Sequence, residues 1–371
     1  MTVSGFAEPG YEQVRDVFDE FFKSGAETGA ALSVWKDGKE VLGLAGGSTD
    51  AGETKAWTAD TLVHTYSTSK PFASLTALTA VAAGALALDE PVAKYWREYA
   101  ANGKQDTTLR HVLTHRAGLP AFPPEAADLD LLDDDGLRRS LAGATPLYEP
   151  GTTTAEHAVT YGHLIDGVLR AATGRSLGEV YSEDVRPALG MDGWFGVPDT
   201  ALARVADLEY QLPGGPEQFV AEVCPSYGDM LRRPAGLLDL DRLNTKEWRQ
   251  SVFGAINLHT SATALGAFYG GLTSPEGPVR TLLGEHLHQE FLASQTCGLD
   301  QTVGISVNWT LGPLLTANFV GLGGLGGSGA WWSFRHDHAV GYVTKRLHDH
   351  LRVAQIAIAL GDDINMQVEC D

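Results

Sequence analysis

Two serine–lysine pairs with a spacing of three residues could do chemistry, Ser33–Lys36 and Ser67–Lys70. Side chains three residues apart share a face on a helix, but they point to opposite faces of a strand. Ser33 lies in a strand-like run, so we expect Lys36 to point away from it. Ser67 lies where an extended run meets a helix, so Lys70 should lie one turn on, within hydrogen-bond reach. This predicts Ser67 as an acylating nucleophile and Lys70 as its first proton acceptor.

The elements that must position this pair follow from hydrophobic periodicity and turn residues. Residues 9–24 show a helical pattern, and residues 29–46 are typical of two strands joined by an Asp37-Gly38 hairpin turn. A long helix is predicted over 71–88, and the field of its N-terminus should help to lower the pKa values of Ser67 and Lys70. Further helices are expected at 109–114, 161–173 and about 348–360, and strands at 304–311, 330–334 and 338–344.

This order of elements predicts an α/β fold. An antiparallel sheet is built from both ends of the chain, helices pack on it, and a helical insertion lies between the two halves. We expect a discontinuous α/β sandwich domain at residues 1–75 and 250–371, and a mainly helical subdomain at 76–249. An acidic run from Asp128 to Asp135 is expected to lie in a solvated loop.

Composition excludes several classes of protein. With 43% hydrophobic and 20% charged residues the chain is typical of a globular enzyme, and a net charge of −20 argues against a nucleic-acid partner. No apolar stretch reaches the ~18 residues of a membrane span, and the first residues show no signal-peptide pattern. Cys224, Cys297 and Cys370 are odd in number and far apart, which predicts no disulfide framework, no zinc site and a reducing compartment. We therefore expect a cytoplasmic protein.

The sequence around Ser67 resembles the active-site segment of serine β-lactamases and penicillin-binding proteins, in particular that of the carboxylesterases related to class C β-lactamases. The resemblance continues in order along much of the chain. The matching stretches are 62–72 (LVHTYSTSKPF), 86–96 (LALDEPVAKYW), 109–120 (LRHVLTHRAGLP), 149–152 (EPGT), 161–164 (YGHL), 174–177 (GRSL) and 323–328 (GGLGGS). It implies a β-lactamase-like fold and an acyl-Ser67 intermediate. By this resemblance the backbone amides of Ser67 and Leu325 form the oxyanion hole.

The chain departs from this family at the second motif, which is Tyr-x-Asn or Tyr-His-Ala in the relatives. Aligned from the EPGT stretch, the corresponding residues here are Glu156-His157-Ala158. A carboxylate beside Lys70 would hold the amine protonated and make it a poorer base. Glu156 could then be the base itself, or His157 could contribute. The competing interpretation is that Tyr161 replaces the missing tyrosine, although that alignment needs an insertion.

A second departure concerns the third motif, which carries a cation in the lactamases. Here it reads Leu322-Gly323-Gly324. Without a cationic side chain at this point, the site should bind the carboxylate of β-lactams and D-Ala-D-Ala peptides weakly. The sequence therefore favours a small-molecule ester or amide with a neutral, fairly apolar acyl group.

Three hypotheses about function remain open at this stage. The first is a carboxylesterase-like serine hydrolase, and the second is an acyltransferase that uses the same acyl-enzyme. The third is a catalytically lapsed protein that keeps the fold. No cofactor and no metal are expected, because the histidine pairs of the chain lack a third ligand at a recognisable spacing.

Overall fold

The computed structural model describes residues 2–370, and its centre is a nine-stranded antiparallel sheet with the order β1-β3-β2-β13-β12-β11-β10-β9-β8. Two small sheets, β14-β6 and β4-β7-β5, lie outside it. The strands of all three sheets are β1 (Val3–Ala7), β2 (Gly29–Lys36), β3 (Lys39–Gly47), β4 (Val63–His64), β5 (Gly193–Trp194), β6 (Glu209–Tyr210), β7 (His259–Thr260), β8 (Thr296–Leu299), β9 (Ser306–Trp309), β10 (Leu314–Leu315), β11 (Phe319–Gly323), β12 (Gly329–Ser333), β13 (His338–Thr344) and β14 (Arg346–Leu347). Strand β2 from the start of the chain pairs with β13 from its end. The α/β fold with a sheet made from both chain ends is thus confirmed.

The β2–β3 hairpin forms for the reason that the sequence indicated. Asp37 and Gly38 have φ values of 50° and 73°, and two successive left-handed residues match the twist of antiparallel strands. The pairing of Lys36 with Lys39 closes the turn. This hairpin fixes the register of the strand pair against which β13 is laid.

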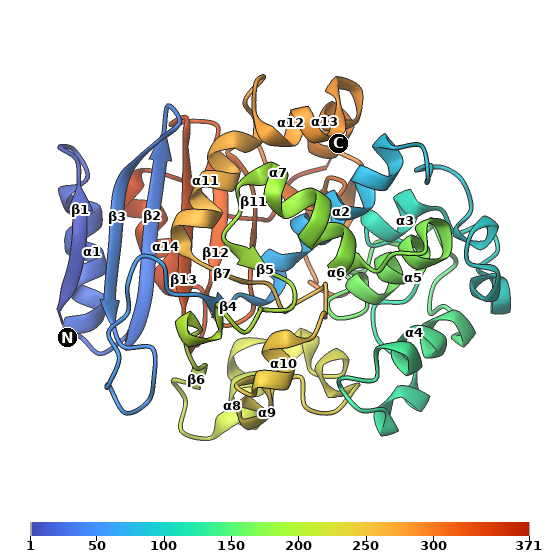
Figure 1. Cartoon of the computed structure of the whole chain (residues 1–371), viewed down its shortest axis with the longest axis horizontal. Coiled ribbons are helices and arrows are strands. Elements are labelled where there is room, and N and C mark those ends of the chain that lie inside the picture. Colours follow the sequence, from blue (N-terminus) through green and yellow to red (C-terminus); the bar gives the residue numbers. More distant parts are fainter. Residues whose placement is uncertain (1, 371) are drawn as a thin grey trace.

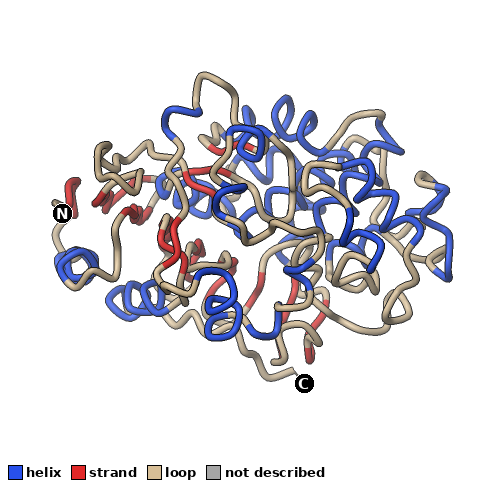
Figure 2. Tube along the Cα trace, turned by 90° about the horizontal axis from the view of Figure 1, so that it is seen from below, coloured by secondary structure: helices blue, strands red, loops and turns tan. Residues whose placement is uncertain are grey.

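Helices cover both faces of the sheet (Figures 1 and 2). They are α1 (Glu12–Lys23), α2 (Lys70–Ala82), α3 (Leu109–Leu113), α4 (Asp134–Gly143), α5 (Tyr161–Thr173), α6 (Leu177–Val180), α7 (Arg186–Leu189), α8 (Gly215–Val223), α9 (Leu240–Leu243), α10 (Lys246–Gln250), α11 (Ala262–Leu272), α12 (Pro278–Leu283), α13 (Glu285–Leu292) and α14 (Leu351–Leu360). Helix α11 packs on one face, against β2 and β13. Helices α1 and α14 share one hydrophobic cluster on the opposite face, where Phe18 meets the ring of Tyr342 at 6.5 Å.

Helix α2 runs through the interior, and most of its residues are buried. A helix that is buried on all sides belongs in a core, and α2 lies between the strands of the large sheet and helices α3 and α5 of the middle segment (Figure 1). The middle segment supplies α3 to α10, whereas the long sheet uses residues 3–47 and 296–344 only. The domain boundaries themselves stay a prediction.

The structure corrects two of the expected elements. The helix predicted over 71–88 ends at Ala82, because Gly84 adopts a φ of 72° that terminates the helical path. The acidic run is not wholly a loop. Asp133 caps the N-terminus of α4 by accepting a hydrogen bond from Gly136 N, and Asp134 and Asp135 form its first turn, where negative charge is stabilising.

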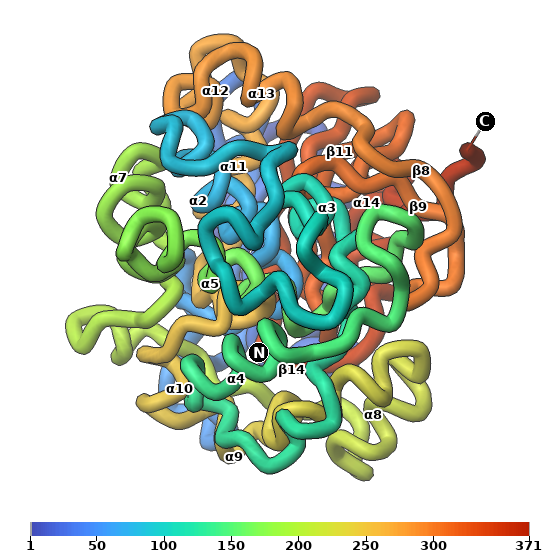
Figure 3. The backbone as a smooth tube through the Cα atoms, turned by 90° about the vertical axis from the view of Figure 1, so that its right-hand side faces the viewer, coloured from blue at the N-terminus to red at the C-terminus, as the bar shows by residue number. Residues whose placement is uncertain are grey.

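The structure also contains one disulfide, although the number and spacing of the cysteines predicted no disulfide framework. Cys297 and Cys370 are bonded, with their Cα atoms 5.6 Å apart across a sequence separation of 73 residues. Their distance in sequence concealed the pair, because the chain end returns to β8 and β9 (Figure 3). Cys224 is a free, buried thiol. Within residues 2–370, no helix combines the length and the apolar character that crossing a bilayer requires.

Candidate active site

Ser67 stands where the chain changes direction sharply. Strand β4 leads to Tyr66, whose φ of 49° lies in the left-handed region, a conformation that costs a side chain on the order of 1–3 kcal/mol. A tight turn, Tyr66–Ser69, follows, and α2 begins at Lys70. Ser67 is the only residue between 61 and 78 that is not buried. The local backbone therefore presents one hydroxyl to a cavity while it buries the neighbours.

Lys70 lies beneath Ser67, one helical turn on. Its Nζ lies 2.7 Å from Ser67 Oγ and 3.1 Å from Glu156 Oε1. The lysine side chain is 0% exposed and that of Glu156 is 6% exposed. Burial lowers the pKa of Lys70, and the charge of Glu156 opposes this effect only in part. The structure thus brings together Ser67, Lys70 and Glu156.

The other serine–lysine pair is structural. Ser33 lies in β2, and its Oγ donates to Glu40 Oε1 at 2.6 Å. The same Oγ accepts a hydrogen bond from Trp35 Nε1 at 2.9 Å. Lys36, an odd number of positions along the strand, points to the other face.

The backbone of Glu156 is clamped by the loop between β8 and β9. Asp300 Oδ1 accepts a hydrogen bond from Glu156 N at 3.0 Å, and Thr302 Oγ1 donates to Glu156 O at 3.1 Å. Burial raises the pKa of Asp300. Asp300 also accepts from Trp309 Nε1 at 3.1 Å, which fixes the carboxylate in the core. No sequence pattern linked this loop to the site, because it lies about 145 residues further along the chain.

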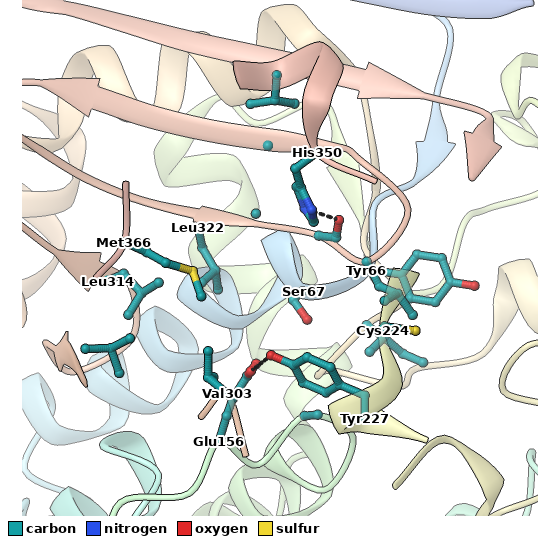
Figure 4. Close-up of a pocket in the computed structure, with 18 of the residues that line it drawn as sticks. Tyr66, Ser67, Glu156, Cys224, Tyr227, Val303, Leu314, Leu322, His350 and Met366 are labelled. Atoms are coloured by element: carbon teal, nitrogen blue, oxygen red, sulfur yellow. Dashed lines mark hydrogen bonds between the residues drawn. The ribbon is translucent and has the colours of Figure 1, made fainter. Parts of the chain in front are cut away.

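Tyr227 is a site residue that sequence reasoning missed. It lies in the turn Pro225–Tyr227 after α8, and its phenol donates a hydrogen bond to Glu156 Oε2 at 2.6 Å (Figure 4). Burial, together with the charge of Glu156, raises the pKa of Tyr227. The phenol of Tyr227 therefore reaches Glu156 from a segment 71 residues beyond the second motif. The sequence offers no signal for this, since the two positions share no spacing rule.

The structure places Tyr161 and His157 away from the cavity, which corrects both expectations. Tyr161 is fully buried at the start of α5, where its phenol lies 2.6 Å from Ser74 Oγ and donates to Leu113 O at 3.0 Å. His157 Nδ1 bonds Ala155 O at 2.8 Å, and its Nε2 accepts from Leu119 N at 3.3 Å. Burial lowers the pKa of His157 to about 4. Both side chains are engaged in holding the core.

The end of β11 lies against the turn Tyr66–Ser69. Leu322, Gly323 and Gly324 line the cavity beside Ser67. A Cβ on Gly324 would stand 2.0 Å from Thr65 O and 3.4 Å from Ser67 N, so only glycine fits there. His350 Nε2 donates to the carbonyl oxygen of Gly324 at 3.0 Å (Figure 4).

A cavity of about 450 Å³ opens at Ser67, and its lining is mostly apolar. Met366, Leu322 and Leu314 lie on one side of Ser67, and Tyr227 and Cys224 lie on the other (Figure 4). No lysine or arginine is among the residues that line it, within the described part of the chain. Within residues 2–370, no three His, Cys, Asp or Glu side chains come together as a metal site would require.

Comparison with known proteins places this arrangement in a family. The beta-lactamase family model matches residues 14–362. "Esterase/beta-lactamase LipL" of Mycobacterium tuberculosis is 33% identical over 208 residues, which cover 56% of this chain and 48% of that protein, so the chain spans about half of its length. A penicillin-binding protein homolog from Caulobacter crescentus superposes with a TM-score of 0.83 at 29% identity, over 97% of this chain and 99% of that chain. A family VIII carboxylesterase superposes with a TM-score of 0.83 at 28% identity over the same shares, 97% and 99%. The chain belongs to the beta-lactamase family and has its fold.

Proposed function

We propose that this chain is a serine hydrolase of the esterase type, which forms a covalent acyl-Ser67 intermediate from a neutral carboxylic ester or amide. The observation that carries the proposal is the 2.7 Å contact between Lys70 Nζ and Ser67 Oγ at an apolar cavity. Relatives support it, since LipL is named an esterase or β-lactamase and the structural neighbour a carboxylesterase.

Glu156 is the net proton acceptor in the proposed acylation. Ser67 Oγ attacks the carbonyl carbon of the ester, and a new C–O bond forms. A buried Lys70 ammonium can accept the serine proton only if it passes one of its own protons on, and Glu156 Oε1 lies 3.1 Å from its nitrogen. The serine proton therefore enters the relay at Lys70, and Glu156 ends with one more proton.

Tyr227 is the group proposed to protonate the leaving alcohol. When the tetrahedral intermediate collapses, the C–O bond to the alcohol breaks and the alkoxide takes the phenol proton. Glu156 returns a proton to Tyr227 across their 2.6 Å hydrogen bond. Because burial and the charge of Glu156 raise the pKa of Tyr227, the phenol keeps its proton until a more basic alkoxide forms. Water then attacks the acyl carbon, its proton enters the same relay, and Ser67 leaves reprotonated.

The oxyanion hole is proposed to consist of the amides of Ser67 and Leu325, worth about 2.7–4 kcal/mol per donor. The Leu325 N–H belongs to the same peptide unit as the Gly324 carbonyl. In a planar trans peptide these two groups point in opposite directions. Because His350 holds the Gly324 carbonyl, it also orients the Leu325 N–H. His350 is therefore a positioning residue for the oxyanion hole.

The lining of the cavity favours a substrate without a carboxylate. Leu322 stands where the lactamases carry a cation, and the described cavity lining holds neither lysine nor arginine. A charged carboxylate in such surroundings would lose its hydration without gaining a partner. A neutral ester avoids this cost and gains from apolar burial.

An active-site probe tests the proposal most directly. A fluorophosphonate should label the wild-type protein at Ser67, as mass spectrometry of peptides would locate, and should not label Ser67→Ala. The same pair should differ in hydrolysis of p-nitrophenyl butyrate, with little turnover of a chromogenic cephalosporin by either. A wild-type protein that neither reacts with the probe nor hydrolyses the ester would instead be a lapsed enzyme.

Hydrolysis and acyl transfer share the acyl-enzyme, so they are separated by their products. Adding an alcohol acceptor to the ester reaction and measuring products by mass spectrometry would reveal transfer as a new ester. A free acid as the sole product would support the hydrolase.

The compartment also stays a prediction. The cysteine count favoured a reducing, cytoplasmic location, whereas the Cys297–Cys370 bond weighs against it, because disulfides persist mainly in oxidising compartments. Free thiols can be counted in the protein purified without reductant. One free thiol would show that the Cys297–Cys370 bond has formed, and three would show that it has not.

A further inference from the structure

The last residues of the chain, 361–370, form an extended tail that lies along the sheet. Its residues alternate between inward and exposed positions, as in a strand. Asp362, Ile364, Met366 and Val368 face inward, and Asp363, Asn365, Gln367 and Glu369 are exposed. This segment continues beyond the final helix that the sequence predicted.

The tail is fastened at both ends. At its start, the Asp362 carboxylate accepts from Trp331 Nε1 at 2.8 Å and Ser333 Oγ at 2.6 Å. Near its end, Val368 N donates to Ser306 O at 3.0 Å, and Cys370 is bonded to Cys297 of β8. Both cysteines are exposed, so a thiol reductant can reach the bond.

Between these fastenings, Ile364 and Met366 line the cavity at Ser67. The opposite wall of this part is the face of the sheet that α14 covers. Leu314 pairs with Gly321, and Gly321 pairs with Trp331, so their side-chain positions lie on one face. A Cβ at Gly321 would stand 2.6 Å from Trp331 Cβ, so this glycine lets the Trp331 side chain lie close against β11. We call this part, lined by Leu314, Leu322, Trp331, Ile364 and Met366, the tail lobe.

The position of the proton-transfer groups indicates which half of an ester the tail lobe receives. The acyl chain and the leaving alcohol extend from the carbonyl carbon in different directions. Tyr227, the proposed donor to the alcohol, lies on the far side of Ser67 from Met366 and Leu314 (Figure 4). The side of Ser67 that faces the tail lobe is therefore left for the acyl chain.

We propose that the C-terminal tail is one wall of the acyl-binding site, that the tail lobe takes a hydrocarbon acyl chain longer than acetyl, and that the Cys297–Cys370 bond maintains its shape. This inference rests on the proposed function of Ser67. It makes Met366 and Ile364 residues that determine specificity, and it makes chain-length preference sensitive to reduction.

The test compares p-nitrophenyl octanoate with p-nitrophenyl acetate, which share a leaving group. Met366→Trp should lower the octanoate-to-acetate ratio of kcat/KM by about tenfold, because it fills the lobe. Gln367→Trp is the matched control: it adds the same ring to the exposed side of the tail, and its ratio should stay within about twofold of wild type. Equal ratios in the two variants would overturn the proposal.

A second variant should shift chain-length preference in the opposite direction, which misfolding would not do. Met366→Ala enlarges the tail lobe, and it should raise the dodecanoate-to-octanoate ratio by about threefold or more. An unchanged ratio here, with normal labelling of Ser67, also counts against the lobe. If the wild-type protein hydrolyses neither octanoate nor acetate, the failure belongs to the proposed function instead.

The disulfide is tested separately. Reducing the wild-type protein should lower the octanoate-to-acetate ratio by about threefold or more, as loss of ordered contacts with a methylene chain would. Cys370→Ser should show the lowered ratio without reductant and no further change with it. If reduction leaves the wild-type ratio unchanged, the bond does not shape the site.

Discussion

Glu156 is the residue on which the proposed chemistry depends most, because a carboxylate cannot act as a phenol does in the same place. A phenol beside Lys70 can give or take a proton while the amine stays neutral. A carboxylate 3.1 Å away favours the ammonium and so must take the proton itself. Tyr227, hydrogen-bonded to that carboxylate, then restores a phenol to the site.

Glu156→Gln should lower kcat by about 10²-fold or more, because it removes the proton acceptor of the relay. The measurement is steady-state hydrolysis of p-nitrophenyl butyrate. Tyr161→Phe is the control that separates the two alignments: its phenol bonds Ser74 and Leu113 in the core, so it should lose about 1 kcal/mol of stability and little activity. Full activity in Glu156→Gln would reject the relay.

Tyr227→Phe should affect substrates according to their leaving group. A p-nitrophenolate leaves without a proton, whereas an alkoxide needs one. We expect kcat to fall by about 10²-fold for an ethyl ester but by about tenfold or less for the p-nitrophenyl ester of the same acid. Equal losses for both esters would assign Tyr227 a structural role.

His350→Phe should lower kcat by about tenfold to 10²-fold with little change in KM, because a misaligned Leu325 amide weakens only the transition state. His350→Gln, which offers an amide donor, should recover part of the loss. A rise in KM at unchanged kcat would show instead that His350 acts on substrate binding.

At the scale of elements, the contact of β11 with the turn Tyr66–Ser69 decides the geometry of the candidate site. The two segments come from opposite ends of the chain, and they touch only because position 324 carries no side chain. The close approach at Gly324 also places the peptide unit that joins Gly324 and Leu325 beside Ser67.

Gly324→Ala should therefore destabilise the protein by about 1–3 kcal/mol, since the new Cβ would stand 2.0 Å from Thr65 O. It should also abolish labelling of Ser67. The matched control is Gly143→Ala at the end of α4, where a Cβ meets nothing within 4 Å, and which should be neutral or stabilising by up to about 1 kcal/mol. Urea unfolding measures both, and similar stabilities would contradict the close approach.

At the scale of the whole molecule, buried histidines make the fold sensitive to acid. Burial lowers the pKa of His157 to about 4 and that of His259 to about 3, from an ordinary value of 6.5. Protonation therefore favours the unfolded chain. Stability is fully present above pH 6.5 and is lost as the pH falls toward these values. Asp300, with its raised pKa, acts in the opposite direction.

We expect the free energy of unfolding to fall between pH 7.5 and 5 by about 2 kcal/mol for each such histidine. Urea unfolding at several pH values checks this. His157→Gln removes one titrating group, so its unfolding free energy should depend less steeply on pH. An equal pH dependence in the wild-type protein and in His157→Gln would show that His157 titrates normally.

The sequence by itself determined the fold class and pointed to Ser67 as the proposed nucleophile. Local rules were enough for α1, for the β2–β3 hairpin and for α5, whose bounds at 161–173 match the expectation. The spacing of Ser67 and Lys70 is also local, since one helical turn joins them. Glu156 could be identified from the sequence because flanking residues aligned it with a known motif.

Only the tertiary structure decided which side chains surround Ser67. Tyr227 meets Glu156 across 71 residues, His350 meets Gly324 across 26, and Cys370 meets Cys297 across 73. Such contacts depend on how the sheet and helices pack, which no spacing in the chain encodes. The same holds for Tyr161 and His157, because packing rather than residue type turned them into the core. Sequence periodicity specifies which face of an element is buried, but only packing specifies what that face meets.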